Sequence, residues 1–221
     1  MDRRSDKHPA LVIDGSGGSV FAGVLDGGGW LAKAERAGAP LENLFPTVEE
    51  ALRAADLRLA DIRGYLYCEG PGSVLGLRLC AMAIETWTRL HPASAQLQKY
   101  NSLRLCALAL LQNAPDLEDA LIVADWKKGA WNALKITGGT AGSTEVIDDE
   151  ALAAWGGALY HLPQRKGWQS PPAGAETLAY DPARIAELRA HPQLLQPTEG
   201  VQLHNTGINT FQKWTPTRHR A

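Results

Sequence analysis

Residues 65–78 read Tyr-Leu-Tyr-Cys-Glu-Gly-Pro-Gly-Ser-Val-Leu-Gly-Leu-Arg, an apolar run followed by a glycine–proline turn. The aromatic and apolar residues at 65–68 favour a strand, and Gly70-Pro71-Gly72 interrupts both regular structures. Ser73 then stands where a helix N-cap is preferred, because its hydroxyl can accept a hydrogen bond from an unpaired backbone N–H. The residues from there to Leu90 keep a helical pattern without proline. The stretch therefore predicts a strand, a tight turn and a long helix.

The three glycines of this stretch also suggest a dinucleotide-binding fingerprint, but two features argue against that interpretation. Their spacing is G-x-G-x-x-x-G, one residue longer than the fingerprint. The next predicted strand, residues 94–98, is followed by Lys99 and not by an acid that would bind a ribose hydroxyl. We interpret the glycines as a structural turn that lets the helix pack closely against its own strand.

Short apolar runs joined by glycine-rich turns come before this stretch. Residues 10–14, 19–25 and 30–37 predict three strands in an antiparallel meander. An apolar stripe with helical spacing follows, and because Pro46 is tolerated only in a first turn, the helix is predicted from near Asn43 to Leu57. Together with a strand at 64–68, a helix at 73–90 and a strand at 94–98, the predicted order is βββαβαβ.

The second half of the chain repeats the opening design of strand, acid, turn and strand. Residues 120–125 form an apolar run that ends in Asp125, and a Lys-Lys-Gly turn leads into a strand at 130–137. The other predicted elements are a helix at 102–112, a loop at 138–144, a short helix at 148–155, a polar loop at 164–174, and a helix at 182–190 with Asp181 as its cap and Pro182 in its first position.

The segment Gly70–Arg78 resembles the G-P-G-S-x-x-G-x-R signature of the TsaB family. The strands that end in Asp14 and Asp125 resemble the openings of that family's two halves, and Gly200–Trp214 resembles its closing segment. The resemblance implies an α/β fold of two ribonuclease-H-like lobes of the actin-like ATPase (ASKHA) kind, the first βββαβαβ and the second reduced. We accordingly expect an N-terminal lobe at residues 1–100 and a smaller C-terminal lobe at 101–221 with a basic tail.

The overall composition argues against several classes of protein. A formal net charge of −2 gives no global reason to expect nucleic-acid or membrane binding. Cys68, Cys80 and Cys106 are widely spaced within apolar runs, which favours buried reduced thiols over disulfides or a zinc site. The sequence shows neither a secretory signal nor an apolar run of membrane-spanning length. We expect a cytoplasmic protein without membrane contact.

The glycine-rich turn after the first strand is a candidate phosphate loop, because successive backbone N–H groups there can form an anion-binding nest. In active relatives of the superfamily the acid before this turn helps to hold magnesium, and a second acid comes from the second half. The TsaB family does not carry out the ATP chemistry itself, so the resemblance implies vestigial loops, with no catalytic residue, cofactor or metal. The candidate residues are Asp14, Ser16, Gly17, Gly18, Ser19 and Asp125.

Two metal-dependent alternatives are disfavoured by the pattern of ligands. A metal site of the TsaD type needs H-x-x-x-H on a helix, whereas the six histidines of this chain are scattered singly. A nuclease of the ribonuclease H type needs carboxylates that converge on two metal ions. Asp14, Glu49 or Glu50, and Glu69 are the available acids, but the helical pattern predicts no acid pair facing the sheet.

The helix predicted at 73–90 is apolar on two faces, whereas a helix that covers one side of a sheet should be polar over about half its circumference. Either the neighbouring helix covers the second face or a partner protein does. The resemblance implies a partner, a TsaD-like protein whose equivalent helices pack on these two. The candidate interface residues are Leu44, Phe45, Val48, Leu52, Ser73, Val74, Leu77, Arg78, Ala81, Ile84 and Glu85.

The resemblance implies a function as well as a fold. The chain would be a non-catalytic scaffold or activator of TsaD, which transfers a threonylcarbamoyl group to adenosine in ANN-decoding tRNAs. Contact with tRNA would be indirect, and a TsaE-like ATPase would be a further partner. A homodimer through the same helices is a second possibility. The alternative from another class is an active ATP-dependent kinase or hydrolase that binds nucleotide between the lobes, through the candidate phosphate loops.

Overall fold

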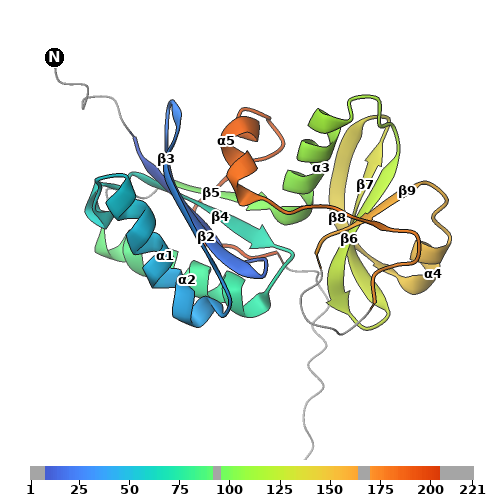
Figure 1. Ribbon diagram of the computed structural model, residues 1–221, viewed down its shortest axis with the longest axis horizontal. Helices are drawn as coiled ribbons and strands as arrows, with labels where there is room; N and C mark the ends of the chain where they lie inside the picture. Colours follow the sequence, from blue (N-terminus) through green and yellow to red (C-terminus); the bar gives the residue numbers. More distant parts are fainter. Residues whose placement is uncertain (1–7, 92–95, 164–169, 205–221) are drawn as a thin grey trace, which may run out of the picture.

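The computed structural model describes residues 8–91, 96–163 and 170–204. These residues form two β-sheets with helices between and around them (Figure 1). One sheet has six strands in the order β11-β5-β4-β1-β2-β3, and the other has five in the order β10-β9-β6-β7-β8. The predicted α/β fold class, with βββαβαβ as its first part, is confirmed.

The six-stranded sheet starts with the predicted meander, because β1 and β2, and β2 and β3, pair antiparallel. β1, β4 and β5 then run parallel, and β11 closes the edge antiparallel to β5. The strands are β1 Ala10–Asp14, β2 Ser19–Asp26, β3 Gly29–Ala37, β4 Gly64–Gly70, β5 Gln96–Asn101 and β11 Gln196–Thr198.

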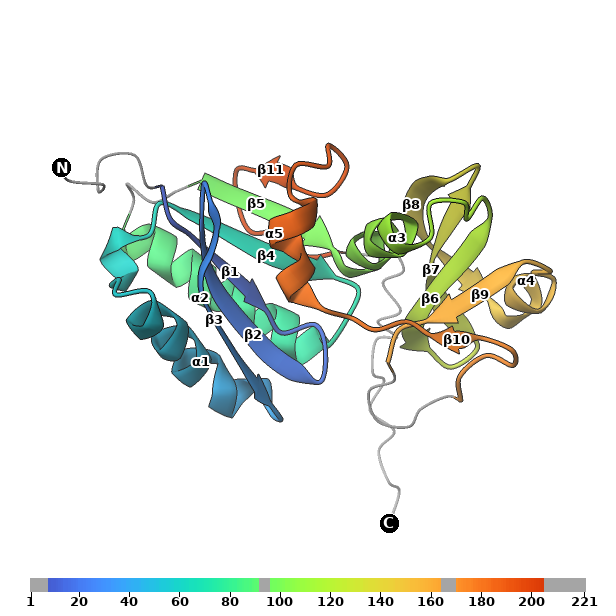
Figure 2. The same cartoon turned by 45° about the horizontal axis from the view of Figure 1, so that its top comes forward.

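Both faces of this sheet are covered, which explains why β1, β2 and β4 read as nearly continuous apolar runs. Two long helices, α1 Pro40–Ala54 and α2 Val74–Leu90, lie side by side on one face (Figure 2). The opposite face packs on α3 Ser102–Asn113 and α5 Ile185–Leu188. The 3₁₀ turns are η1 Leu59–Asp61 and η3 Pro182–Arg184.

The five-stranded sheet is an antiparallel meander of β6, β7 and β8 with β9 parallel to β6 and β10 parallel to β9. Its outer face packs on the short helix α4, which Asp148 caps by accepting a hydrogen bond from the backbone N–H of Ala151 at 2.8 Å. The remaining bounds are β6 Ala120–Lys127, β7 Ala130–Thr137, β8 Thr140–Asp148, α4 Asp149–Ala153, β9 Ala158–His161 and β10 Glu176–Thr177.

Helix α3 lies between the two sheets and joins their inner faces into one hydrophobic core (Figure 1). Leu103 and Leu105 of this helix are fully or almost fully buried in the same cluster as Val12 of β1 and Ile122 of β6. The two sheets are therefore packed through a shared helix, and the space between them at the N-terminal end of α3 is where a ligand site would be expected.

The first helix begins three residues earlier than the sequence predicts. Gly38 has a positive φ of 110°, Ala39 is the extended N-cap, and Pro40 takes the first helical position, for which its fixed φ suits it. Pro46 then lies in the second turn, where it removes the one N–H that would reach the carbonyl of residue 42. The predicted start near Asn43 was wrong because one missing hydrogen bond is compatible with a well-packed helix.

The predicted loop at 138–144 is also wrong, because only Gly138 and Gly139 form the turn, both with positive φ, and β8 follows at once. β8 is an edge strand with mostly exposed residues, so it lacks the apolar pattern that marks a strand. The predicted helix at 182–190 is shorter and is divided into η3 and α5. β9, β10 and β11 were not predicted, since they are short and depend on pairing with distant strands.

Three predictions fall wholly or partly on residues outside the described ranges. These are the first two residues of the strand predicted at 94–98, residues 164–169 of the predicted polar loop, and the basic tail beyond residue 204.

Candidate functional site

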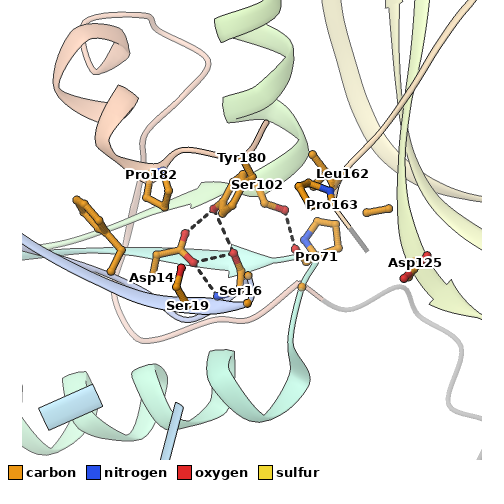
Figure 3. A pocket seen from close by; sticks show the side chains of 15 residues that line it. Asp14, Ser16, Ser19, Pro71, Ser102, Asp125, Leu162, Pro163, Tyr180 and Pro182 are labelled. Carbon is orange, nitrogen blue, oxygen red and sulfur yellow. Dashed lines mark hydrogen bonds between the residues drawn. The ribbon is translucent and has the colours of Figure 1, made fainter. Parts of the chain in front are cut away.

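A cavity of about 170 Å³ opens between the two sheets, at the end of β1 and beside the first turn of α3 (Figure 3). All six residues of the predicted phosphate loops line it, so the fold brings both halves of that prediction together. Asp14 to Ser19 come from the six-stranded sheet, and Asp125 comes from the five-stranded sheet on the opposite side (Figure 3).

Asp14 is 1% exposed, and its carboxylate is surrounded by hydroxyl and amide donors. Oδ1 accepts from the backbone N–H of Ser16 at 2.7 Å and from the hydroxyl of Ser16 at 2.7 Å. Oδ2 accepts from the hydroxyls of Tyr100 and Tyr180. A carboxylate has about four acceptor positions, and these four donors fill them.

The two tyrosines are the functional residues that sequence analysis missed. Tyr100 lies at the end of β5 and Tyr180 in the segment after β10, far along the chain from Asp14. Burial, reinforced by the negative charge of Asp14, raises the pKa of both phenols well above the usual value. Both hydroxyls therefore stay protonated as donors at neutral pH. No local pattern marks them, because their role depends on the packing of three distant segments.

The glycines of the 65–78 stretch allow the start of α2 to lie in close contact with the turn after β1. A Cβ on Gly76 would lie 1.9 Å from the carbonyl oxygen of Gly15, and a Cβ on Gly72 would lie 2.5 Å from the Cβ of Ser16. The backbone N–H of Ser73 donates to the carbonyl of Ser16 at 2.8 Å. The Ser73 hydroxyl accepts from the N–H of Gly76 at 3.3 Å, which confirms the predicted N-cap. The structural interpretation of these glycines accounts for their spacing.

The residues present do not fit a magnesium–nucleotide complex. Small-molecule pockets typically have volumes of roughly 300–1,000 Å³, and this cavity has about 170 Å³. The acid that would approach the metal, Asp14, has its acceptor positions taken by protein donors. Within residues 8–91, 96–163 and 170–204, no three His, Cys, Asp or Glu side chains are grouped so that they could hold a metal ion.

The acids considered for a nuclease do not converge. Glu49 is exposed, Glu50 accepts from Arg36 at 2.7 Å, and Glu69 forms an ion pair with Lys99 at 2.9 Å. Each has a different environment from Asp14, so the geometry does not support two-metal chemistry.

The candidate interface residues divide into two groups in the structure. Phe45, Val74, Arg78 and Glu85 are exposed, and Ser73 is partly exposed at the start of α2. The other six lie in the core of the chain itself, with exposed fractions of 9% or less, and are Leu44, Val48, Leu52, Leu77, Ala81 and Ile84.

All large hydrophobic residues that are strongly exposed in the described part of the chain belong to α1 and α2. We call this set the α1–α2 apolar face. Neighbouring helix α1 covers α2 only in part, through contacts such as the edge-to-face packing of Phe45 on Trp87 at 6.3 Å. The face consists of Leu41, Phe45, Val74, Leu75, Met82 and Leu90, which are 55% to 67% exposed.

Within the described ranges, no helix has both the length and the apolar composition needed to cross a membrane.

Comparison with known proteins gives a family match over part of the chain and a shared fold. The family model described as TsaD, tRNA N6-adenosine threonylcarbamoyltransferase, matches residues 36–116, the segment that contains α1, β4, α2, β5 and α3. The resemblance noted at Gly70–Arg78 is therefore confirmed by a match over the surrounding segment. No curated protein sequence matches the chain.

Among the solved structures that match the chain, two share its fold over most of their own length. YeaZ from Pseudomonas aeruginosa is 17% identical with a TM-score of 0.55, and the alignment covers 70% of this chain and 74% of that one. A protein described as uncharacterized with similarity to peptidase YEAZ, from Pseudomonas aeruginosa, is 16% identical with a TM-score of 0.63, covering 90% of this chain and 99% of that one. The fold is thus shared with YeaZ over 70% of this chain and with the second structure over 90% of it.

Proposed function

We propose that this chain is a non-catalytic subunit of the machinery that makes threonylcarbamoyladenosine on tRNA, and that it docks on a TsaD-like protein through the α1–α2 apolar face. The match of residues 36–116 to the TsaD family and the fold shared with YeaZ support the assignment to this process. In this proposal the TsaD-like partner performs the transfer to adenosine of ANN-decoding tRNAs. A TsaE-like ATPase is a further partner, and contact with tRNA is indirect.

The observation that carries the proposal is the α1–α2 apolar face. Six large hydrophobic side chains on two adjacent helices are more than half exposed, whereas the other large hydrophobic residues of the described chain are buried or partly buried. Concentrated exposed apolar surface marks interaction sites on soluble proteins. Fully burying one large apolar side chain contributes roughly 1.5–3 kcal/mol. Six side chains that are 55% to 67% exposed can therefore offset much of the roughly 4–15 kcal/mol that association costs.

The geometry around Asp14 supports the non-catalytic part of the proposal. A catalytic carboxylate must be able to bind a metal, a water or a substrate proton. The four donors to Asp14 leave no acceptor position for such a partner.

We also propose that the two lobes divide near residue 100, where β5 passes into α3.

The test is co-purification of the full chain with the TsaD-like protein of the same organism, using variants that add charge to the exposed face. Met82→Glu and Leu75→Glu should weaken capture at least about a hundredfold, because each removes apolar burial and places a carboxylate in an apolar contact. Thr140→Glu is the matched control, since Thr140 is exposed on β8 in the other sheet. All three variants should unfold at the wild-type temperature.

Three results would contradict the proposal. Capture by Met82→Glu and Leu75→Glu at the wild-type level would show that this face is not the docking site. A wild-type dimer in light scattering that Met82→Glu dissociates, without capture of the TsaD-like protein, would favour the homodimer. Magnesium-dependent ATP turnover by the chain alone, lost in Asp14→Ala, would favour the kinase or hydrolase.

A further inference from the structure

The segment that carries Tyr180 crosses from one sheet to the other (Figure 2). It is fixed to the five-stranded sheet by the backbone N–H of Leu178, which donates to the carbonyl of His161 in β9 at 2.8 Å. It is fixed to the six-stranded sheet by the carbonyl of Ala183, which accepts from the indole Nε1 of Trp30 in β3 at 2.9 Å. Tyr180 lies between these two attachments.

The side chain of Tyr180 points from this segment into the turn after β1 (Figure 3). Its hydroxyl donates to Asp14 Oδ2 and lies 3.1 Å from the hydroxyl of Ser16. Its ring covers the same turn, because a Cβ on Gly17 would lie 3.7 Å from the ring atom Cδ1. The tyrosine thus stands over the backbone groups that the sequence predicts as a phosphate loop.

We propose that Tyr180 is an internal latch that takes the place of a ligand in the cavity. It binds Asp14 and the turn after β1, and so holds the crossing segment between the two sheets. It also excludes a magnesium–nucleotide complex from the cavity. This inference does not depend on the proposed function, because it concerns only contacts within the chain.

The chemistry of the group suits a permanent latch. The carboxylate of Asp14 is buried and negatively charged, so it needs donors to remain there. Tyr180 supplies one of them from the segment that crosses between the sheets, whereas Tyr100 supplies another from β5, in the same sheet as Asp14. The raised pKa of the Tyr180 phenol keeps its proton in place through the neutral and mildly alkaline range.

The test compares three substitutions that each remove one hydroxyl from the full chain. Tyr180→Phe removes the latch hydroxyl. Tyr100→Phe removes a second hydroxyl that donates to the same carboxylate, but Tyr100 does not connect the two sheets. Tyr160→Phe is the control, since Tyr160 in β9 is a partly buried member of the same core. The measurements are the thermal midpoint and amide hydrogen exchange.

Tyr180→Phe should lower the midpoint by several degrees and raise exchange in residues 178–183 and 15–19 by roughly tenfold or more, as expected when one hydrogen bond to a charged group is lost. Tyr100→Phe should lower the midpoint but leave exchange in residues 178–183 unchanged. Tyr160→Phe should change neither. Exchange in residues 178–183 that is equal in Tyr180→Phe and Tyr160→Phe would overturn the latch.

A ligand titration tests directly whether the magnesium–nucleotide complex is excluded from the cavity. Millimolar Mg²⁺ with ATP, and Mg²⁺ alone, should leave the thermal midpoint of the wild-type chain unchanged, because a ligand that binds only the folded state would raise it. A rise with Mg²⁺ and ATP that is absent in Asp14→Asn would overturn the inference. Capture of the TsaD-like protein is a separate measurement, so failure of the latch and failure of the proposed function are distinguishable.

Discussion

Replacing Gly76 by alanine should destabilise the protein, although alanine is the better helix former. Gly76 lies in the first turn of α2, where the change to alanine would by itself stabilise by about 1 kcal/mol. In this fold the added Cβ would lie 1.9 Å from the carbonyl oxygen of Gly15. The oxygen is a backbone atom and the Cβ is bonded directly to the backbone, so neither can move without displacing the end of β1 or the start of α2.

The expected magnitude follows from this contact. Ordinary contact with a Cβ begins near 3.4 Å, so the two segments must separate by about 1.5 Å. That displacement breaks the hydrogen bond from Ser73 N to Ser16 O at 2.8 Å, which contributes about 1 kcal/mol. Overpacking adds roughly 1–3 kcal/mol, near the upper end because backbone meets backbone. After the helix propensity gain, the free energy of unfolding should fall by about 3 kcal/mol.

Urea denaturation followed by circular dichroism measures this change, and the thermal midpoint should fall by roughly 6–12 °C in a chain of this length. Gly156→Ala is the control, because a Cβ there meets no atom within 4 Å. That variant should be neutral or more stable by about 0.4–1 kcal/mol. A Gly76→Ala protein as stable as the wild type, or more stable, would refute the close contact between α2 and the turn after β1.

Two further predictions concern residues of the same region. Ile84→Ala should lower the free energy of unfolding by about 2–5 kcal/mol, because Ile84 is fully buried. Met82→Ala, two positions away and 63% exposed, should change it by less than about 0.5 kcal/mol in the same urea titration. Tyr65→Phe should stabilise by about 1 kcal/mol, since within the described residues the buried Tyr65 hydroxyl has no hydrogen-bond partner. Burial raises the pKa of Tyr65 to about 12, so wild-type stability present below pH ~10 is lost as the pH rises toward 12. The advantage of Tyr65→Phe over wild type should therefore grow in denaturation curves recorded above pH ~10, and an advantage that shrinks there would contradict the assignment.

The apolar pattern of the sequence predicts most of the six-stranded sheet, because glycine-rich turns, which are local features, mark the ends of its strands. It predicts α2 and its cap for the same reason, since Ser73 acts on an amide three residues away. It does not predict β8, whose residues are mostly exposed, or β11, which is a strand only because β5 lies beside it. Pairing between distant segments leaves little signal in either sequence alone.

The candidate interface shows the same limit. Helical spacing predicts that α2 is apolar on two faces, but not which face the chain covers itself. The structure buries Leu77 and Ile84 and leaves Leu75 and Met82 exposed, because the sheet and α1 pack on one side of the helix only. The docking proposal therefore rests on the second pair.

The sequence alone determined that Asp14 ends the first strand and that a glycine-rich turn follows it, since both are local patterns, whereas β6 continues past Asp125 to Lys127. Only the tertiary structure decided what surrounds the first of these acids. Tyr100 reaches Asp14 because β5 lies in the same sheet as β1, and Tyr180 reaches it because the chain after β10 crosses back over the cavity. The function of a carboxylate depends on which donors lie within about 3 Å of it. Which donors come that close is decided by packing between segments far apart in the chain.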